Sequence, residues 1–151
     1  MIKLIPSKNA DTIMSFIKGP ALLARCSGGV DLSGVNAKEA IRQSKATFLI
    51  ATEDGLKGYG FIMLKPEGGQ SVSIHLCLRT VGERTRRIFA LALHYAKLVM
   101  GASTIHAVFP ESYRGCQRLA KSFNFKDDPT LKPYYAIKSV LPYAYKRLDL
   151  A

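Results

Sequence analysis

The sequence has no tryptophan and only three cysteines, Cys26, Cys77 and Cys116, whose spacing matches no metal-binding motif. No apolar run approaches the roughly 18 residues that a membrane-spanning helix needs. The first residues also lack the long apolar core of a signal peptide. These absences argue against a metal-cluster protein, a membrane protein and a secreted protein, so we expect a cytoplasmic protein that does not bind a membrane.

Acidic residues are also scarce. The chain has 22 lysines and arginines against 11 aspartates and glutamates, which gives a formal net charge of +11. This excess of positive charge favours an anionic partner, and three kinds are considered: a nucleic acid, a phosphorylated cofactor and an acidic protein surface. A solvated basic surface explains the charge equally well. No aromatic-basic signature of an RNA-binding module is present, so nucleic acid is the weakest of these interpretations.

The length and composition are those of one folded domain covering residues 1–151. A chain of this size buries roughly 68–70% of its unfolded surface. Hydrophobic residues make up 48% of the chain, which is enough for a core and argues against general disorder.

The hydrophobic pattern predicts an α/β (α+β) fold with the order β-α-α-β-β-β-α-β-α-β-β. Apolar residues at helical spacing and capping residues indicate the helices, and runs rich in β-branched residues indicate the strands. A glycine-rich segment, 22–34, is predicted to be a loop or a broken helix. The expected strands are 1–6, 46–53, 58–65, 71–78, 103–109, 134–140 and 143–149, and the expected helices are 7–19, 36–44, 79–99 and 111–123.

The connectivity predicts a mixed sheet. Three successive strands between 46 and 78 form an antiparallel meander. The strand, helix and strand that follow, from 71 to 109, demand a parallel pair joined by a crossover. We therefore expect helices on both faces of one sheet.

Basic side chains crowd the start of the helix predicted after strand 71–78, where the helix dipole disfavours cations. They are Arg79, Arg84, Arg86 and Arg87. One explanation is a bound anion, because free amides at a helix N-terminus bind phosphate. The other is a capping box, in which Thr80 and Glu83 occupy the same amides and the arginines are simply solvated. The sequence leaves both open.

The order of elements and the segment 79–84, Arg-Thr-Val-Gly-Glu-Arg, resemble the GNAT superfamily of N-acetyltransferases. The signature of that superfamily is Gln/Arg-x-x-Gly-x-Gly/Ala. The resemblance implies a GNAT-like fold and binding of acetyl-CoA, whose pyrophosphate lies on backbone amides at this turn. The residues that it assigns to the cofactor are Cys77, Leu78, Arg79, Thr80, Val81, Gly82, Glu83, Arg84 and Thr85.

The same resemblance implies direct transfer of an acetyl group to an amine, between the fourth and fifth strands. His75 is the catalytic residue expected on the fourth strand, and His106 lies on the fifth. The family's acidic tyrosine falls at Ala120, so Tyr113 becomes the candidate acid, and Arg84 stands where the family has glycine or alanine. Each histidine and Tyr113 fits an ordinary structural role as well.

These departures leave two further interpretations beside the enzyme. The chain resembles, in size and in its eroded motif, small GNAT-like proteins encoded by tailed phages, and some of those are packaged with the virion. A non-catalytic assembly protein that binds an acidic protein or a phage particle is therefore the alternative. A basic nucleic-acid-binding protein is the third interpretation, and the acceptor amine stays unknown.

Overall fold

The computed structural model describes residues 1–17, 36–54, 57–135 and 141–150. The segment predicted as a loop or broken helix, 22–34, which includes Cys26, lies outside these residues. The strands are β1 Ile2–Ser7, β2 Thr47–Glu53, β3 Lys57–Pro66, β4 Ser71–Leu78, β5 Thr104–Pro110, β6 Lys126–Asp127 and β7 Tyr143–Asp149. The helices are α1 Ala10–Ser15, α3 Ala37–Gln43, α4 Glu83–Leu98, α5 Arg114–Ser122, the 3-10 turn η1 Pro129–Leu131 and α6 Lys132–Tyr135.

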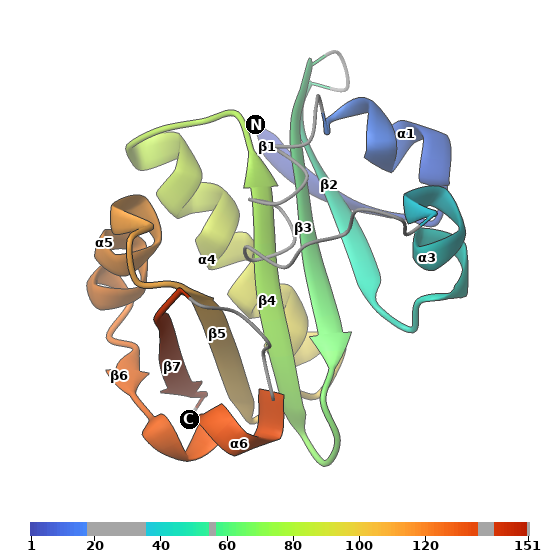
Figure 1. The fold of residues 1–151 in the computed structure, drawn as a ribbon. Coiled ribbons are helices and arrows are strands. Elements are labelled where there is room, and N and C mark those ends of the chain that lie inside the picture. Colours follow the sequence, from blue (N-terminus) through green and yellow to red (C-terminus); the bar gives the residue numbers. More distant parts are fainter. Residues whose placement is uncertain (18–35, 55–56, 136–140, 151) are drawn as a thin grey trace.

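The described strands form one sheet in the order β1-β2-β3-β4-β5-β7-β6 (Figure 1). Neighbouring strands run antiparallel except β4 and β5, which are parallel and are joined through α4. The predicted meander, the single parallel pair and the mixed α/β class are therefore confirmed.

Helices cover both faces of the sheet, and each face has its own apolar core. On one face, α4 and α5 pack over the central strands, with Ile88 and Ala92 of α4 fully buried. On the other face, α1 and α3 cover the first strands, with Ile13 at the centre of the contact. None of the helices in the described residues is long and apolar enough to cross a membrane.

Two short helices begin where the sequence places their caps. The side chain of Asn9 accepts a hydrogen bond from the amide of Thr12 at 3.1 Å, and that of Asn36 accepts from Glu39 at 3.2 Å. Asparagine at this position satisfies an amide that the first turn leaves free. The helices predicted at 7–19 and 36–44 are thereby confirmed, with bounds one to a few residues shorter.

The strand predicted at 134–140 is wrong in its described part, because Tyr134 and Tyr135 belong to the helix α6. Asp128 starts this helical stretch by accepting a hydrogen bond from the amide of Thr130 at 3.1 Å. The strand that accompanies β7 at this edge is instead β6, whose two residues are too short for a periodic pattern.

Gly60 brings β3 unusually close to the end of β4. Its φ of 122° lies in a region that favours glycine, and a Cβ atom placed there would lie 2.0 Å from the carbonyl oxygen of Cys77. The pairing of β2 with β3 also shifts register beside it, between Ala51 and Thr52. Glycine therefore fixes the path of β4 just before the turn into α4.

Candidate active site

A gap opens between the two parallel strands in the middle of the sheet. β4 and β5 pair only from Ser71 and Thr104 to Ser73 and His106. Beyond that point β4 stays paired with β3 as far as Leu78, while β5 stays paired with β7. The facing edges of the two strands therefore separate, and beyond this point the strands form no backbone hydrogen bonds with each other.

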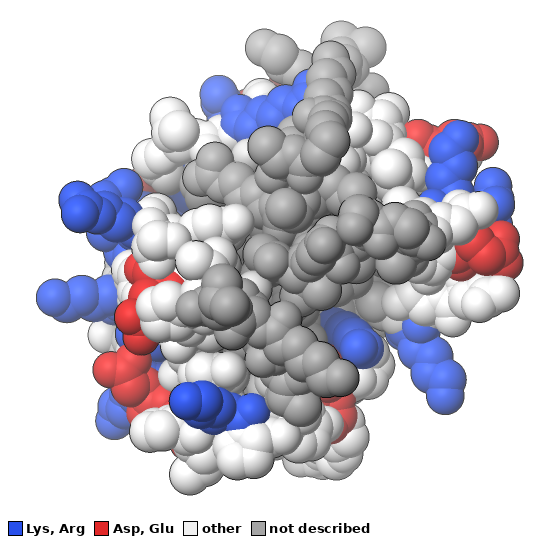
Figure 2. Space-filling view, in the orientation of Figure 1, with Lys and Arg blue, Asp and Glu red and all other residues white. Residues whose placement is uncertain are grey.

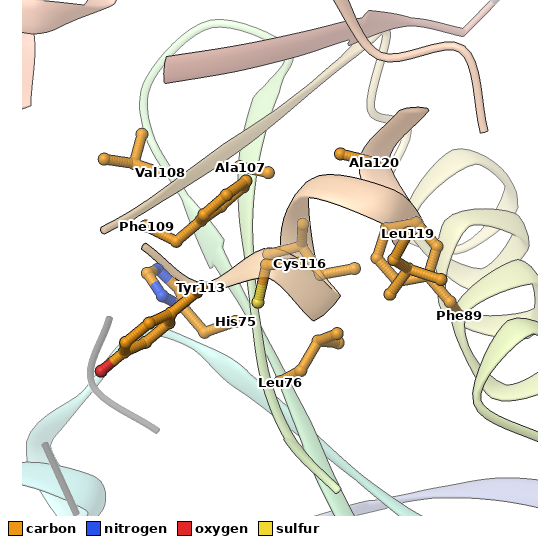
Figure 3. Close-up of a pocket in the computed structure, with 11 residues that line it drawn as sticks. His75, Leu76, Phe89, Ala107, Val108, Phe109, Tyr113, Cys116, Leu119 and Ala120 are labelled. Atoms are coloured by element: carbon orange, nitrogen blue, oxygen red, sulfur yellow. The ribbon is translucent and has the colours of Figure 1, made fainter. Parts of the chain in front are cut away.

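Side chains fill most of this gap. The remaining cavity is about 50 Å³, which has room for one or two water molecules. Figure 3 shows the sulfur of Cys116 near the middle, with His75 and Tyr113 together at one end. The residues that line it are Ile74, His75, Leu76, Phe89, Ala107, Val108, Phe109, Tyr113, Cys116, Leu119 and Ala120.

The start of α4 follows the end of β4, whose edge toward β5 is unpaired there, and it offers free amides. Gly82 is the residue that precedes the helix, with φ 65° and ψ −135°, and it makes no side-chain cap. The first amide that bonds back is that of Arg86, which donates to the carbonyl oxygen of Gly82 at 3.2 Å. Within the described residues, the amides of Glu83, Arg84 and Thr85 have no acceptor. Free amides and the helix dipole together make this turn suitable for an anion.

The capping-box interpretation is wrong. The hydroxyl of Thr80 lies 2.7 Å from the hydroxyl of Thr85, not on a backbone amide. The carboxylate of Glu83 faces Arg86 at 3.8 Å instead of reaching back over the turn. The helix also begins at Glu83 and not at residue 79. The two residues that were expected to occupy the amides therefore leave them unoccupied.

Arg79 does not direct its guanidinium toward this turn. Its side chain donates to the carbonyl oxygen of Phe16 at 3.0 Å and lies over the ring of the same residue. Its backbone amide donates to Tyr59 of β3 at 2.8 Å. The arginine of the signature thus stabilises the C-terminal end of α1, where cations are favoured by the helix dipole.

Arg84 and Arg86 are also held by the protein. The guanidinium of Arg84 lies 3.7 Å from the carboxylate of Glu53 and over the ring of Tyr59, which donates to the same carboxylate. Arg86 lies over the ring of Phe123. Three of the four arginines at this helix start are therefore explained by contacts within the described residues, and the free amides are the stronger sign of an anion.

His75 lies at one end of the gap and keeps a neutral ring near pH 7. It is half-buried, and the packing around its ring lowers the pKa to about 4, with nearby Lys65 acting in the same direction. A neutral imidazole can accept a proton. Tyr113, at the start of α5, lines the same cavity and is also half-buried. The structure thus brings the two predicted catalytic residues to one place.

The other predicted cofactor residues follow the backbone from the gap to the helix. Cys77 is buried and Leu78 is half-buried at the end of β4, while Val81 is 88% exposed in the turn. Ala120, at the family's tyrosine position, is buried in the cavity wall and supplies no acid. Free groups in this stretch are therefore found on its backbone, and binding of the cofactor to these residues stays a prediction.

His106 stands apart from the cavity, at the point where the strands separate. Its Nδ1 lies 2.9 Å from the hydroxyl of Tyr135, and burial lowers the pKa of the ring. Ser73, its pairing partner on β4, donates to Glu67 at 2.8 Å. The sequence did not reveal this buried polar group, because Tyr135 was predicted in a strand. The group ties α6 to the sheet where the gap begins.

Among the described residues, the charges on the face that carries α1 and α3 form no single basic patch. Figure 2 shows blue and red side chains interspersed around the rim of this face, with grey residues over its centre. On the described part of this face, side chains of the two signs are therefore mixed.

The site fits one part of coenzyme A better than another. The free amides at the start of α4 and the open space around Gly82 suit the diphosphate. The cavity of about 50 Å³ between β4 and β5 is smaller than a pantetheine arm. Side chains of α5, such as Cys116 and Leu119, must therefore shift before the arm can enter.

Comparisons with solved structures agree with this arrangement. The N-acetyltransferase PseH of Campylobacter jejuni, in complex with acetyl coenzyme A, aligns over 100% of both chains with a TM-score of 0.67 and 14% identity. Spermidine N-acetyltransferase of Vibrio cholerae, in complex with CoA and spermine, aligns over 99% of this chain and 94% of its own, with a TM-score of 0.71 and 9% identity. A candidate acetyltransferase of the GNAT family from Desulfovibrio desulfuricans gives a TM-score of 0.69 at 14% identity, over 100% of both chains.

Sequence comparisons add nothing to this, since no family model and no curated protein matches the chain. The similarity to the solved structures covers the whole sheet and its helices, including the pair of parallel strands around which the gap lies. The chain therefore has the fold of the GNAT N-acetyltransferases.

Proposed function

We propose that the protein is an N-acyltransferase that moves an acetyl group from acetyl-CoA directly to an amine. The observation that carries this proposal is the continuity between the gap, which opens after Ser73 and His106, and the free amides at Glu83, Arg84 and Thr85. A diphosphate on those amides and an acyl group in the gap belong to one ligand of suitable length. The fold of the solved N-acetyltransferases supports the same proposal.

The chain's own residues divide the work between the two ends of the site. Gly82 and the three amides bind the diphosphate, because glycine at positive φ lets the backbone turn its N–H groups outward. The edge of β4 near Cys77 and Leu78 that faces β5, where the two strands no longer pair, lies beside the acyl group. Bound acetyl-CoA supplies a thioester, which is an acyl group already activated for attack by an amine.

His75 is the group that accepts the proton of the attacking amine. Its ring is neutral at pH 7, since its pKa is about 4, and it lines the cavity. The low pKa makes it a weak base. It therefore removes the proton most readily after the amine has attacked the thioester and become positively charged. Tyr113, at the same end of the cavity, is the donor for the departing thiolate.

The charge of the chain bears on the acceptor. A net charge of +11 repels polycations such as the spermine bound by the Vibrio cholerae enzyme. A neutral or acidic molecule that carries one amine is a better acceptor for this surface. The acceptor class therefore differs, in this proposal, from that of the polyamine acetyltransferases of the same fold.

The test has a binding arm and a turnover arm. Acetyl-CoA at millimolar concentration is expected to raise the melting temperature by several degrees, because a ligand that binds only the folded chain stabilises it. Acetylation of a panel of small amines, followed by release of free CoA thiol, tests turnover. The absence of any thermal shift contradicts the proposal as a whole.

A second function is favoured by the filled gap. The cavity of about 50 Å³ and the alanine at position 120 are both unfavourable for catalysis. A non-catalytic protein that retains the GNAT fold as a scaffold for assembly explains both features. Binding of CoA without turnover of any amine, or no binding at all, supports this second function, whereas sustained acetylation excludes it.

A further inference from the structure

The solvent-facing side of α4 carries a stripe of exposed side chains along its length. Arg87, Leu91, His94 and Leu98 follow one another at intervals of four, three and four residues. This spacing places them on one face of a helix and is the spacing of residues that contact a partner helix. All four are exposed, and Leu98 is exposed by 65%. We call these four residues the α4 stripe.

An open groove of about 540 Å³ lies between the α4 stripe and the start of β1. Its walls are mainly apolar, with Met1 and Ile2 on one side and Ala90 and Leu91 on the other. Large apolar side chains are usually withdrawn from water, and a contiguous apolar patch beside a groove is typical of a contact surface. The groove has room for a leucine-sized side chain of a partner.

The groove is also positively charged on its rim. Arg87 has no hydrogen-bond or ion-pair partner among the residues that the structure describes. The nearby acids are taken up elsewhere, since Glu53 faces Arg84 at 3.7 Å and Glu83 faces Arg86 at 3.8 Å. The guanidinium of Arg87 therefore remains available to a carboxylate from outside.

The charge decides between two occupants. A second copy of this chain would bring a surface with a net charge of +11 against the same surface and place like charges near each other. A partner with acidic residues gains from the same field. The regular spacing of the α4 stripe suits a helix, because its side chains interlock with those of another helix at these intervals.

We propose that the α4 stripe binds an amphipathic helix of another protein, which carries leucine-like residues toward Leu91 and Leu98 and a carboxylate toward Arg87. This surface lies on the side of α4 opposite Phe89, which lines the gap. The proposal therefore holds whether or not the protein is a transferase.

The probe for this proposal is a pair of synthetic helical peptides of equal length. Both carry leucines at the contact positions. Beside these leucines, one peptide carries glutamates and the other carries lysines. We expect the glutamate peptide to bind the full-length protein in a fluorescence anisotropy titration, more weakly as salt is raised. The lysine peptide is expected to bind at least about tenfold more weakly. Equal binding of both peptides, or of neither, overturns the proposal.

Variants locate the site. Leu98→Ser is expected to lower the affinity for the glutamate peptide about tenfold. Arg87→Glu is expected to make the protein bind the lysine peptide more tightly than the glutamate peptide. The matched controls are Ile5→Ser, which changes another exposed apolar residue, on β1 (47% exposed against 65% for Leu98), and Arg118→Glu, which makes the same charge change on α5. If the controls weaken binding as much as the stripe variants, the peptide binds through general basicity and the proposal is wrong. A dimer in sedimentation that Leu98→Ser dissociates also contradicts it, because the occupant is then a second copy.

Discussion

The amide of Arg86 donates to the carbonyl oxygen of Gly82 at 3.2 Å, and it is the first amide of α4 to bond within the helix. The amides of the three residues between Gly82 and Arg86 therefore have no acceptor in the described residues. This relationship, rather than the cluster of arginines, makes the start of α4 suitable for an anion.

Replacing Gly82 by alanine is expected to weaken CoA binding. Its φ of 65° is costly for any residue with a Cβ atom, by about 1 kcal/mol, and relief of that strain turns the amides away from the diphosphate. Titration calorimetry with CoA measures the loss, which we expect to be at least about tenfold.

Gly101→Ala is the matched control for that variant. Gly101 has a φ of 69°, and a Cβ atom there also meets open space, but it lies at the other end of α4. We expect the same loss of stability with CoA affinity unchanged. An equal loss of affinity in the two variants would mean that helix stability, and not the geometry of the turn, decides binding.

Arg79→Ala is expected to destabilise the fold more than it affects the cofactor. Its guanidinium bonds the carbonyl oxygen of Phe16 at 3.0 Å, and loss of this charge-assisted contact costs about 1 kcal/mol at an exposed site. Urea unfolding measures that cost. The control is Arg118→Ala, which replaces an exposed arginine on α5 and is expected to change the free energy of unfolding little. A large loss of CoA affinity without loss of stability would instead place Arg79 in the binding site.

The pKa of His75 predicts acid sensitivity of the fold. The folded ring has a pKa of about 4 against an ordinary value of 6.5, so the unfolded chain binds more protons between these two values. Stability is then complete above about pH 6.5 and falls as the pH is lowered toward 4. The difference of about 2.5 pH units corresponds to about 3 kcal/mol.

Unfolding of His75→Gln across this pH range tests that prediction. We expect the variant to lose about 3 kcal/mol less than the wild type between pH 6.5 and pH 4. His94→Gln, which removes an exposed histidine of α4, is expected to follow the wild type. Identical pH profiles for His75→Gln and the wild type would show that the ring is not held neutral in the fold.

Tyr113→Phe separates a catalytic tyrosine from a structural one. The ring stays in place at the end of the cavity, and only the hydroxyl is lost. We expect kcat for acetyl transfer to fall by about 10²-fold, with KM for acetyl-CoA nearly unchanged. If stability falls while kcat per folded molecule does not, the hydroxyl serves packing and the proposed donor role is wrong.

The sequence predicted the elements better than the site. The strand 71–78 alternates clearly and is found with the same bounds, because one of its faces lies on the α4 core. The turn at Asp128 was missed as a helix start, and Tyr135 was assigned to a strand as a result. Local capping by a single side chain decided that element, and it is a weaker signal than periodicity.

For the site, the glycine at position 82 was the informative residue, since its conformation is required by the turn itself. The separation of β4 from β5 was expected only from the resemblance to the GNAT superfamily, because strand pairing depends on residues far apart in the chain and local patterns do not reveal it. The contacts of Arg79 and Arg84 with Phe16 and Tyr59 are likewise long-range. They explain why the charges of these arginines were a poor guide to the proposed anion site.

The most direct test is an NMR titration of the ¹⁵N-labelled protein with CoA. We predict that the amide signals of Glu83, Arg84 and Thr85 move first and furthest, with His75 and Leu76 following as the arm enters the gap. Shifts confined to scattered lysines and arginines, with these three amides unmoved, would contradict the account.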